Sequence, residues 1–233
     1  MSASVSITED CGLEVIDLRG YPEFEARSLH LRDVATQMQG MQRIAHAFVE
    51  SPETILQELV NAAVELCDAD SAGISLEIDA EHRSDTNYFQ WVATAGRYQR
   101  FLNATLPRVP SACGTCLERG QPQLFRVTQR FFDLMGVAAP TVTDGLLLPW
   151  QVEEMRGTIW IMAHERVEAF DSNDCRMMQG AGRFFRDGCA ARAATAHADE
   201  PGKRDGRSCH GERFGAPDQQ SAAKPDEPCV SGS

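Results

Sequence analysis

A helical segment that leads directly into two strands is the feature that most limits the folds open to this chain. Over residues 51–66 the apolar side chains recur every three or four positions and make one broad face. Residues 72–79 and 88–95 then alternate apolar and polar side chains, which is typical of half-buried strands. A helix followed by two neighbouring strands predicts an antiparallel sheet with its helices gathered to one side, the α+β class.

The downstream pattern adds more strands and shorter helices. Ser111 is placed to cap a helix that Gly120 ends, and Asp171 is placed to cap the last helix, which fades near residue 194. The whole pattern predicts a central sheet of about five to six strands, with helices packed on it and long helices at both ends. Further strands are predicted at 122–127, 142–152 and 158–164, a short helix at 131–135, and polar connections at 81–87 and 153–157.

The chain outside the sheet divides into an arm, a helix and a tail. Residues 1–27 are expected to form a loosely ordered N-terminal arm, with one short strand at 13–18. Residues 28–50 show an a/d spacing of apolar side chains that predicts an amphipathic helix, which either packs on its own domain or pairs with a second subunit. Residues 199–233 hold too few apolar side chains to offset the entropy of ordering, and they predict a disordered tail.

The charge of the chain excludes two classes of partner. The formal net charge is -12 and the pI is about 4.9. Nucleic acid is therefore not expected as a partner, because phosphate binding needs concentrated positive charge, and neither is an anionic membrane surface. The N-terminus lacks the basic start and apolar stretch of a signal peptide, and no apolar run is long enough to span a bilayer. We therefore expect a cytoplasmic protein whose eight cysteines are reduced thiols.

Four segments resemble the GAF domain family, in the order of that fold. They are residues 110–115 at the start of a pocket helix, 144–150 and 157–164 on two core strands, and 170–174 at the entry to the last helix. These segments are similar to the N-terminal GAF sensor domains of bacterial sensor histidine kinases. The resemblance implies a GAF-like sensory domain over 51–198.

The resemblance leaves the ligand and any cofactor unknown, because GAF domains bind cyclic nucleotides, haem, bilins, amino-acid derivatives or metals. Histidine kinase motifs are not recognisable in the chain, and neither is a Gly-rich phosphate loop, a GxSxG elbow or an HExxH helix. The sequence therefore predicts a regulatory module without its own catalytic output domain, acting on a separate signalling kinase or regulator.

Cys113 and Cys116 are the strongest candidates for reactive side chains in the sequence. Both fall in the first turn of the helix capped by Ser111, where the backbone amides and the helix dipole are expected to lower a thiol pKa. Their spacing also suits a reversible disulfide. The alternative is ordinary packing in the lining of a pocket. A structural zinc site needs four ligands and no second pair accompanies these thiols, so no metal site is predicted.

Large aromatic side chains near the sheet are the other candidate ligand contacts, since an apolar pocket with few polar groups is the default site in such a domain. His164 is a candidate haem ligand, or else a strand-end histidine bonded to a loop. Arg97, Arg108 and Arg126 are candidate donors to an anionic ligand, or else surface charges. Phe89, Trp91 and Ala93 are expected on one strand face. The predicted ligand-binding residues are Trp91, Ser111, Cys113, Cys116, Phe131, Phe132, Trp150 and Trp160.

Three functions stay open at this point. The leading one is a small-molecule or redox sensor whose ligand shifts the packing of terminal helices across a homodimer. The second is a small thiol reductase resembling the GAF-type methionine sulfoxide reductases, in which Cys113 attacks the sulfoxide and Cys116 resolves the adduct. The third is a degenerate GAF scaffold that mediates protein–protein contacts.

Overall fold

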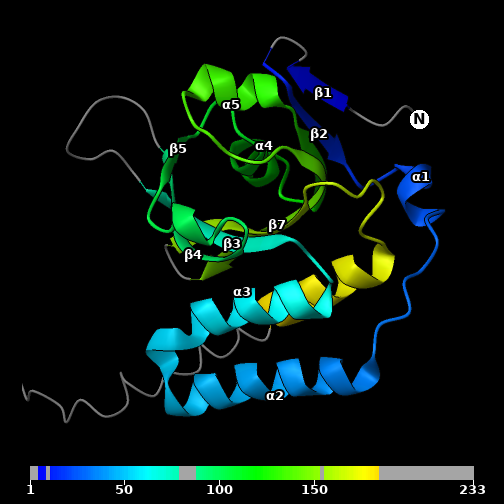
Figure 1. Cartoon of the computed structure of the whole chain (residues 1–233), viewed down its shortest axis with the longest axis vertical. Helices are drawn as coiled ribbons and strands as arrows, with labels where there is room; N and C mark the ends of the chain where they lie inside the picture. Colours follow the sequence, from blue (N-terminus) through cyan, green and yellow to red (C-terminus); the bar gives the residue numbers. More distant parts are fainter. Residues whose placement is uncertain (1–4, 9–10, 79–87, 153–154, 184–233) are drawn as a thin grey trace, which may run out of the picture. The chain divides into compact units, whose positions relative to one another are not determined.

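One curved antiparallel sheet organises the chain (Figure 1). The computed structural model describes residues 5–8, 11–78, 88–152 and 155–183. Within these residues eight strands form a single sheet in the order β1-β2-β6-β7-β8-β3-β4-β5. The strands are β1 (Val5–Thr8), β2 (Leu13–Asp17), β3 (Ser71–Ile78), β4 (Tyr88–Gly96), β5 (Thr105–Pro107), β6 (Gln123–Val127), β7 (Val142–Val152) and β8 (Met155–Ala163).

The predicted α+β class and antiparallel sheet are confirmed, but the strand number is higher than the predicted five to six. The extra strands are at the two edges. β1 at one edge pairs with β2, the strand predicted in the N-terminal segment, and β5 at the other edge pairs with β4 through three residues. The predicted connection at 81–87 and the predicted tail at 199–233 lie outside the described residues.

Helices cover both faces of the sheet. On one face α3 (Ile55–Leu66) lies between the sheet and α2 (Val34–Glu50), and the helix over 172–183 lies beside α3 (Figure 1). On the other face the sheet curves around α4 (Ala112–Arg119) and α5 (Gln129–Met135). The short helix α1 (Pro22–Glu25) follows β2. None of the helices in the described ranges is long and apolar enough to cross a membrane.

The expected loose arm is wrong for its described part, although the short strand predicted within it is present. β2 pairs with β6 from Leu13 to Asp17, and its apolar side chains are buried. The difference arises because β2 completes the edge of a sheet whose pairing strand lies more than 100 residues later, so nothing local signals its order. The segment is therefore a structural part of the domain.

The predicted helix at 28–50 begins later, at Val34. Asp33 caps it by accepting hydrogen bonds from the backbone N–H groups of Ala35 and Thr36. Its inner face packs on α3, where a Cβ atom at Gly40 would lie 2.9 Å from Leu66 Cδ2. Its outer face carries exposed apolar side chains, and pairing of this face with a second subunit stays a prediction. The exposed residues in and just before α2 are Leu31, Val34, Met38 and Met41.

The sheet separates two apolar cores, one on the α3 side and one on the α4 side. A β-bulge divides the side chains of β4 between them. Ile74 pairs with Ala93 but Ser75 pairs with Trp91, so Val92 is the extra residue. Ala93 therefore points to the α3 side, whereas Trp91 and Phe89 point to the α4 side. The prediction that Phe89, Trp91 and Ala93 share one face is wrong, because strict alternation does not hold across a bulge.

Candidate functional site

A partly open cavity lies between the sheet and the layer formed by α4 and α5. Its volume is about 110 Å³. The walls are almost wholly apolar, and no charged side chain lines them among the described residues. The lining residues are Leu13, Trp91, Tyr98, Phe101, Ala104, Thr105, Leu106, Ala112, Cys113, Phe125, Val127, Phe131, Phe132, Met135, Val137, Ala139, Val142, Leu147, Trp160 and Met162.

Four aromatic side chains, which we call the aromatic wall, form one side of the cavity: Trp91, Tyr98, Phe101 and Trp160. The Trp91 ring stacks on Tyr98 with a centroid distance of 5.7 Å and lies 5.0 Å from the centroid of Trp160. Phe101 meets both Trp91 and Tyr98 edge-on. Aromatic pairs in such geometries gain energy beyond their area burial, so these contacts stabilise the wall.

Trp160 lies flat against the sheet because its neighbour on β3 is a glycine. A Cβ atom at Gly73 would overlap the Trp160 ring. The Trp160 indole N–H donates to Ser75 Oγ at 3.0 Å, so the polar edge of this buried ring has a partner. These contacts fix the ring at the base of the cavity.

The helix α4 is capped as the sequence predicts. Ser111 accepts from the backbone N–H of Gly114 at 2.9 Å and donates to the carbonyl of Arg108 at 2.7 Å. Gly120 ends the helix in the left-handed conformation. Ser111 itself does not line the cavity, and its side chain caps and positions α4.

The two thiols of α4 are buried, and this overturns the predicted lowering of their pKa. Cys113 lines the cavity, accepts from Thr158 Oγ1 at 3.2 Å and donates to Ser75 Oγ at 3.7 Å. Burial raises the pKa of Cys113, and it raises the pKa of Cys116 well above the usual value. Desolvation of a thiolate therefore outweighs the helix dipole. Cys116 points toward the carbonyls of Gln121 and Leu147 and lies outside the cavity lining.

Raised thiol pKa values predict a loss of stability at alkaline pH. The unfolded chain ionises its cysteines above about pH 8.5, whereas the folded chain keeps Cys113 and Cys116 protonated. The stability that the two buried, protonated thiols contribute is therefore fully present below that pH. Above it, the free energy of unfolding is expected to fall by as much as about 1.4 kcal/mol per pH unit for each buried thiol. Urea denaturation between pH 7 and pH 10 measures this slope.

The control for this prediction is Cys113→Ala. This variant should reduce the fall in the free energy of unfolding at alkaline pH by up to about 1.4 kcal/mol per pH unit, which corresponds to one proton. Peptide mapping after iodoacetamide treatment gives an independent check. The prediction fails if Cys113 in the folded protein at pH 8 is alkylated as fast as the half-buried Cys11, because a buried neutral thiol reacts slowly.

The cavity brings together five of the eight predicted ligand-binding residues. Trp91, Cys113, Phe131, Phe132 and Trp160 line it. Besides Ser111 and Cys116, the third exception is Trp150, which packs in the other core, on the α3 side of the sheet.

Sequence reasoning missed Tyr98 and Phe101, which belong to the aromatic wall. They fall in and beside the 3-10 turn Gln99–Phe101, which carries no strand alternation. Their aromatic character, a few residues after β4, was the one available signal.

The anion-site hypothesis for Arg97, Arg108 and Arg126 is not supported. None of the three lines the cavity. Each pairs with a carboxylate instead: Arg97 with Glu165, Arg108 with Glu77 and Glu118, and Arg126 with Glu14.

His164 is a strand-end residue bonded to its surroundings. Its Nδ1 contacts the Thr141 carbonyl at 2.7 Å and its Nε2 contacts Ser71 Oγ at 2.8 Å. Both ring nitrogens are thus engaged, and burial lowers the pKa of the imidazole, which favours the neutral form with Nδ1 as donor. His164 does not line the cavity, and its contacts match the predicted strand-end histidine bonded to a loop.

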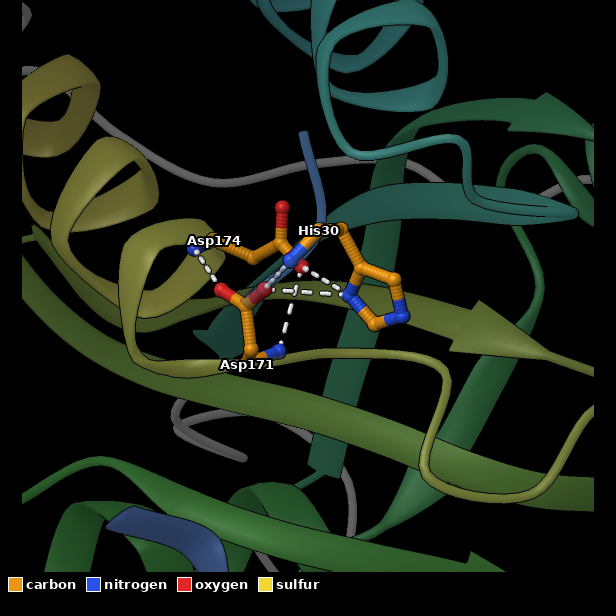
Figure 2. Close-up of side chains that lie close together, drawn as sticks. All are labelled: His30, Asp171 and Asp174. Carbon is orange, nitrogen blue, oxygen red and sulfur yellow. Dashed lines mark hydrogen bonds and ion pairs between the residues drawn. The ribbon is translucent and has the colours of Figure 1, made fainter. Parts of the chain in front are cut away.

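A polar cluster on the α3 side joins the chain before α2 to the start of the last helix (Figure 2). His30, Asp171 and Asp174 lie close enough to resemble a set of metal ligands. Their ligand atoms are already used, however. Asp171 caps the helix by accepting from the N–H groups of Asn173 and Asp174, and Asp174 accepts two hydrogen bonds from Arg32. The arrangement is a helix cap with an ion pair, as Asp171 predicts from sequence.

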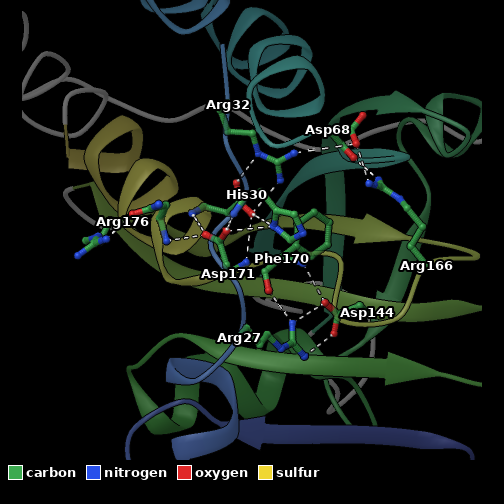
Figure 3. A network of polar contacts seen from close by, with 11 residues as sticks. Arg27, His30, Arg32, Asp68, Asp144, Arg166, Phe170, Asp171 and Arg176 are labelled. Carbon is green, nitrogen blue, oxygen red and sulfur yellow. Dashed lines mark hydrogen bonds and ion pairs between the residues drawn. The ribbon is translucent and has the colours of Figure 1, made fainter. Parts of the chain in front are cut away.

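A buried ion pair extends this network into the sheet (Figure 3). Arg27 donates to both carboxylate oxygens of Asp144, at 2.8 and 3.1 Å, and to the carbonyl of Phe170 at 2.6 Å. The N–H of Phe170 donates to the same carboxylate. The sequence gives no local sign of this pairing, because Arg27 is 117 residues from Asp144.

The curved antiparallel sheet has helices on both faces and an apolar cavity between it and the layer of α4 and α5, and this arrangement defines an α+β domain of the GAF type. The model of the GAF domain family matches residues 49–184, and the chain belongs to this family. The strands β1 and β2 and nearly all of α2 precede the matched region. No curated protein matches the chain significantly.

Solved structures agree on the fold. The GAF domain of an Acinetobacter phosphoenolpyruvate-protein phosphotransferase is 14% identical, with a TM-score of 0.50 over 69% of this chain and 97% of that one. The corresponding domain from Coxiella burnetii is 18% identical, with a TM-score of 0.50 over 70% and 98%. A phytochrome photosensory core module from Stigmatella aurantiaca is 14% identical, with a TM-score of 0.52 over 74% of this chain and 40% of that one. Similarity at this level of identity indicates a shared fold.

Proposed function

We propose that this protein is a GAF regulatory module that encloses a small molecule in the cavity beside the aromatic wall. The observation that carries the proposal is an almost wholly apolar cavity behind the sheet, which costs packing energy unless something occupies it. The proposed function is sensing, with the signal passed to a separate kinase or regulator.

The size of the cavity limits what it encloses. Pockets for drug-sized ligands measure about 300–1,000 Å³, and this cavity measures about 110 Å³. A haem or a bilin is therefore too large for the conformation described. The proposed ligand is a molecule with the size of a single small ring.

The sheet offers a route from the cavity to the helices. On β3 and β8, neighbouring residues face opposite sides: Trp160 faces the cavity, whereas Ile159 and Ile161 pack in the core with α3. Movement of the Trp160 ring on ligand binding displaces these strands, α3 packs on the sheet, and α2 packs on α3 (Figure 1). The proposed signal is a change in the packing of α2, which is a shift between two conformations of differing ligand affinity.

Two methionines in the cavity provide a direct test of occupancy. Met135 and Met162 line the cavity, whereas Met38 and Met41 lie on the exposed face of α2. In protein labelled with ¹³C at the methionine methyl groups, xenon or benzene is expected to shift the NMR signals of Met135 and Met162. The shifts should reach a plateau as the probe concentration rises. Both probes enter dry apolar cavities of similar size.

The signals of Met38 and Met41 are the internal control, and they should stay in place at low probe concentration. If saturating xenon and benzene leave Met135 and Met162 unchanged, the cavity does not accept ligands. That result would favour the scaffold alternative over the sensor.

We also propose that α2 pairs with α2 of a second copy of this chain. Its outer face repeats apolar residues at a/d spacing, and Met38 is 60% exposed. Met38→Glu is expected to shift the protein from dimer to monomer in light-scattering measurements, because it buries a charge in the pair. Glu50→Gln at the end of α2 is the control. A wild-type protein that is monomeric at high concentration contradicts the proposal.

The reductase alternative has less support. It needs a reactive thiolate at Cys113 and a resolving thiol at Cys116, whereas burial raises the pKa of both. Cys113 is instead a weakly polar part of the cavity lining.

A further inference from the structure

Trp91, a residue of the cavity lining, carries a buried polar atom that lacks a partner in the described part of the chain. The indole nitrogen Nε1 of Trp91 is buried and has no hydrogen-bond acceptor among the residues that the structure describes. Trp160, the other tryptophan of the aromatic wall, donates to Ser75. Buried indole N–H groups normally find an acceptor, so the orphaned donor on Trp91 needs an explanation.

Trp91 is held firmly in this position. Its backbone N–H donates to the carbonyl of Ala104 and its carbonyl accepts from Asn103. The β-bulge at Val92 turns its side chain to the cavity side, and Tyr98 and Trp160 pack on the ring. The ring therefore does not swing away to find an acceptor elsewhere.

The other buried polar groups on the lining are satisfied within the protein. Tyr98 donates to the carbonyl of Pro140 at 2.7 Å, and Cys113 is bonded to Ser75 and Thr158. Thr105, which also lines the cavity, is exposed to solvent. The buried lining thus offers a ligand one unused donor in the described part of the chain, and it offers no charge.

We propose that the ligand is a small neutral molecule, mostly apolar, with a carbonyl or similar acceptor oxygen that accepts a hydrogen bond from Trp91 Nε1. This inference rests on the proposed function, because it names the chemical class of the molecule that the cavity encloses. An ionised ligand is disfavoured, since no charged side chain is present to offset its desolvation. A hydrocarbon leaves the indole N–H unpaired, whereas a ketone pairs it.

The test uses two probes of equal shape. Cyclohexanone carries an acceptor oxygen where methylenecyclohexane carries a CH₂ group. Their dissociation constants are measured on wild-type protein and on Trp91→Phe, which keeps an aromatic ring and removes the donor. Trp91→Phe is expected to weaken the binding of cyclohexanone about 5-fold more than the binding of methylenecyclohexane. This is the ratio of affinities that one net hydrogen bond supplies. The void left by the smaller ring affects both probes, so the ratio isolates the donor.

The wild-type protein gives a second readout that needs no variant. The chain has three tryptophans, so its indole N–H spectrum is simple. Cyclohexanone should move the Trp91 indole proton downfield, with little change at Trp160, which already donates to Ser75. Methylenecyclohexane should not produce this downfield shift.

The outcomes separate this inference from the proposed function. If both probes bind but Trp91→Phe affects them equally and the Trp91 proton does not respond to the ketone, the acceptor proposal is overturned while the cavity remains a binding site. If neither probe binds the wild-type protein, the proposed function fails as well.

Discussion

Arg27→Met is expected to lower the free energy of unfolding by about 3–5 kcal/mol, because it leaves a buried carboxylate without its cation. The side chain of Arg27 is 4% exposed and that of Asp144 is fully buried. After the substitution Asp144 keeps one hydrogen bond, from the N–H of Phe170, which does not compensate a buried charge. Urea denaturation at pH 7 measures the change.

Two controls identify the cause. Arg19→Met removes a solvent-exposed partner of Asp17 in the same N-terminal segment and should change stability little. The double variant Arg27→Met/Asp144→Leu should recover most of the lost stability, because apolar replacement of a whole buried ion pair is often neutral. If Arg27→Met costs no more than Arg19→Met, the buried pair does not hold the N-terminal segment to the sheet.

Local features of the fold are predictable from the sequence. The strand at 142–152 appears as predicted, and Ser111, Gly120 and Asp171 act as the caps that their residue types indicate. Each of these features depends on residues a few positions apart. The same holds for the helix–strand–strand order that leads to the α+β class.

Features set by distant pairing are not predictable in this way. The order of β2 depends on β6, and the partner of Asp144 comes from a segment 117 residues earlier. The pKa values of Cys113 and Cys116 also depend on the fold. Their position in a helix is visible in the sequence, but their burial is not, and burial decides the direction of the pKa shift.

The residues of the cavity lining are also only partly predictable from the sequence. The sequence predicts Trp150 as a ligand contact because it is a large aromatic near the sheet, yet it packs on the α3 side. β7 is buried on both faces, so its run of apolar residues carries no alternation to show which face each occupies. The structure shows that Leu146, Leu148 and Trp150 share one face and that Leu147 takes the other.

Trp160→Ala is expected to cost about 3–5 kcal/mol and to enlarge the cavity by the volume of an indole ring. Trp160 is 1% exposed, packs on Trp91 and Tyr98, and forms the base of the aromatic wall. The new void opens into the existing cavity. Free indole should therefore bind the variant and restore part of its stability, by an amount that grows with indole concentration. Thermal unfolding at a series of indole concentrations measures the rescue.

Trp160→Phe separates packing from hydrogen bonding. It keeps a ring on Gly73 but loses the donor to Ser75, so a smaller loss of about 1–2 kcal/mol is expected, without rescue by indole. Equal losses for the two variants would show that the ring does not support the wall. If Trp160→Ala is rescued and Trp160→Phe is not, ligand occupancy and folding stability are coupled at one side chain. That side chain belongs to a strand whose next residues, Ile159 and Ile161, pack in the core with α3, so the same coupling gives a bound molecule a physical means of acting on the helices.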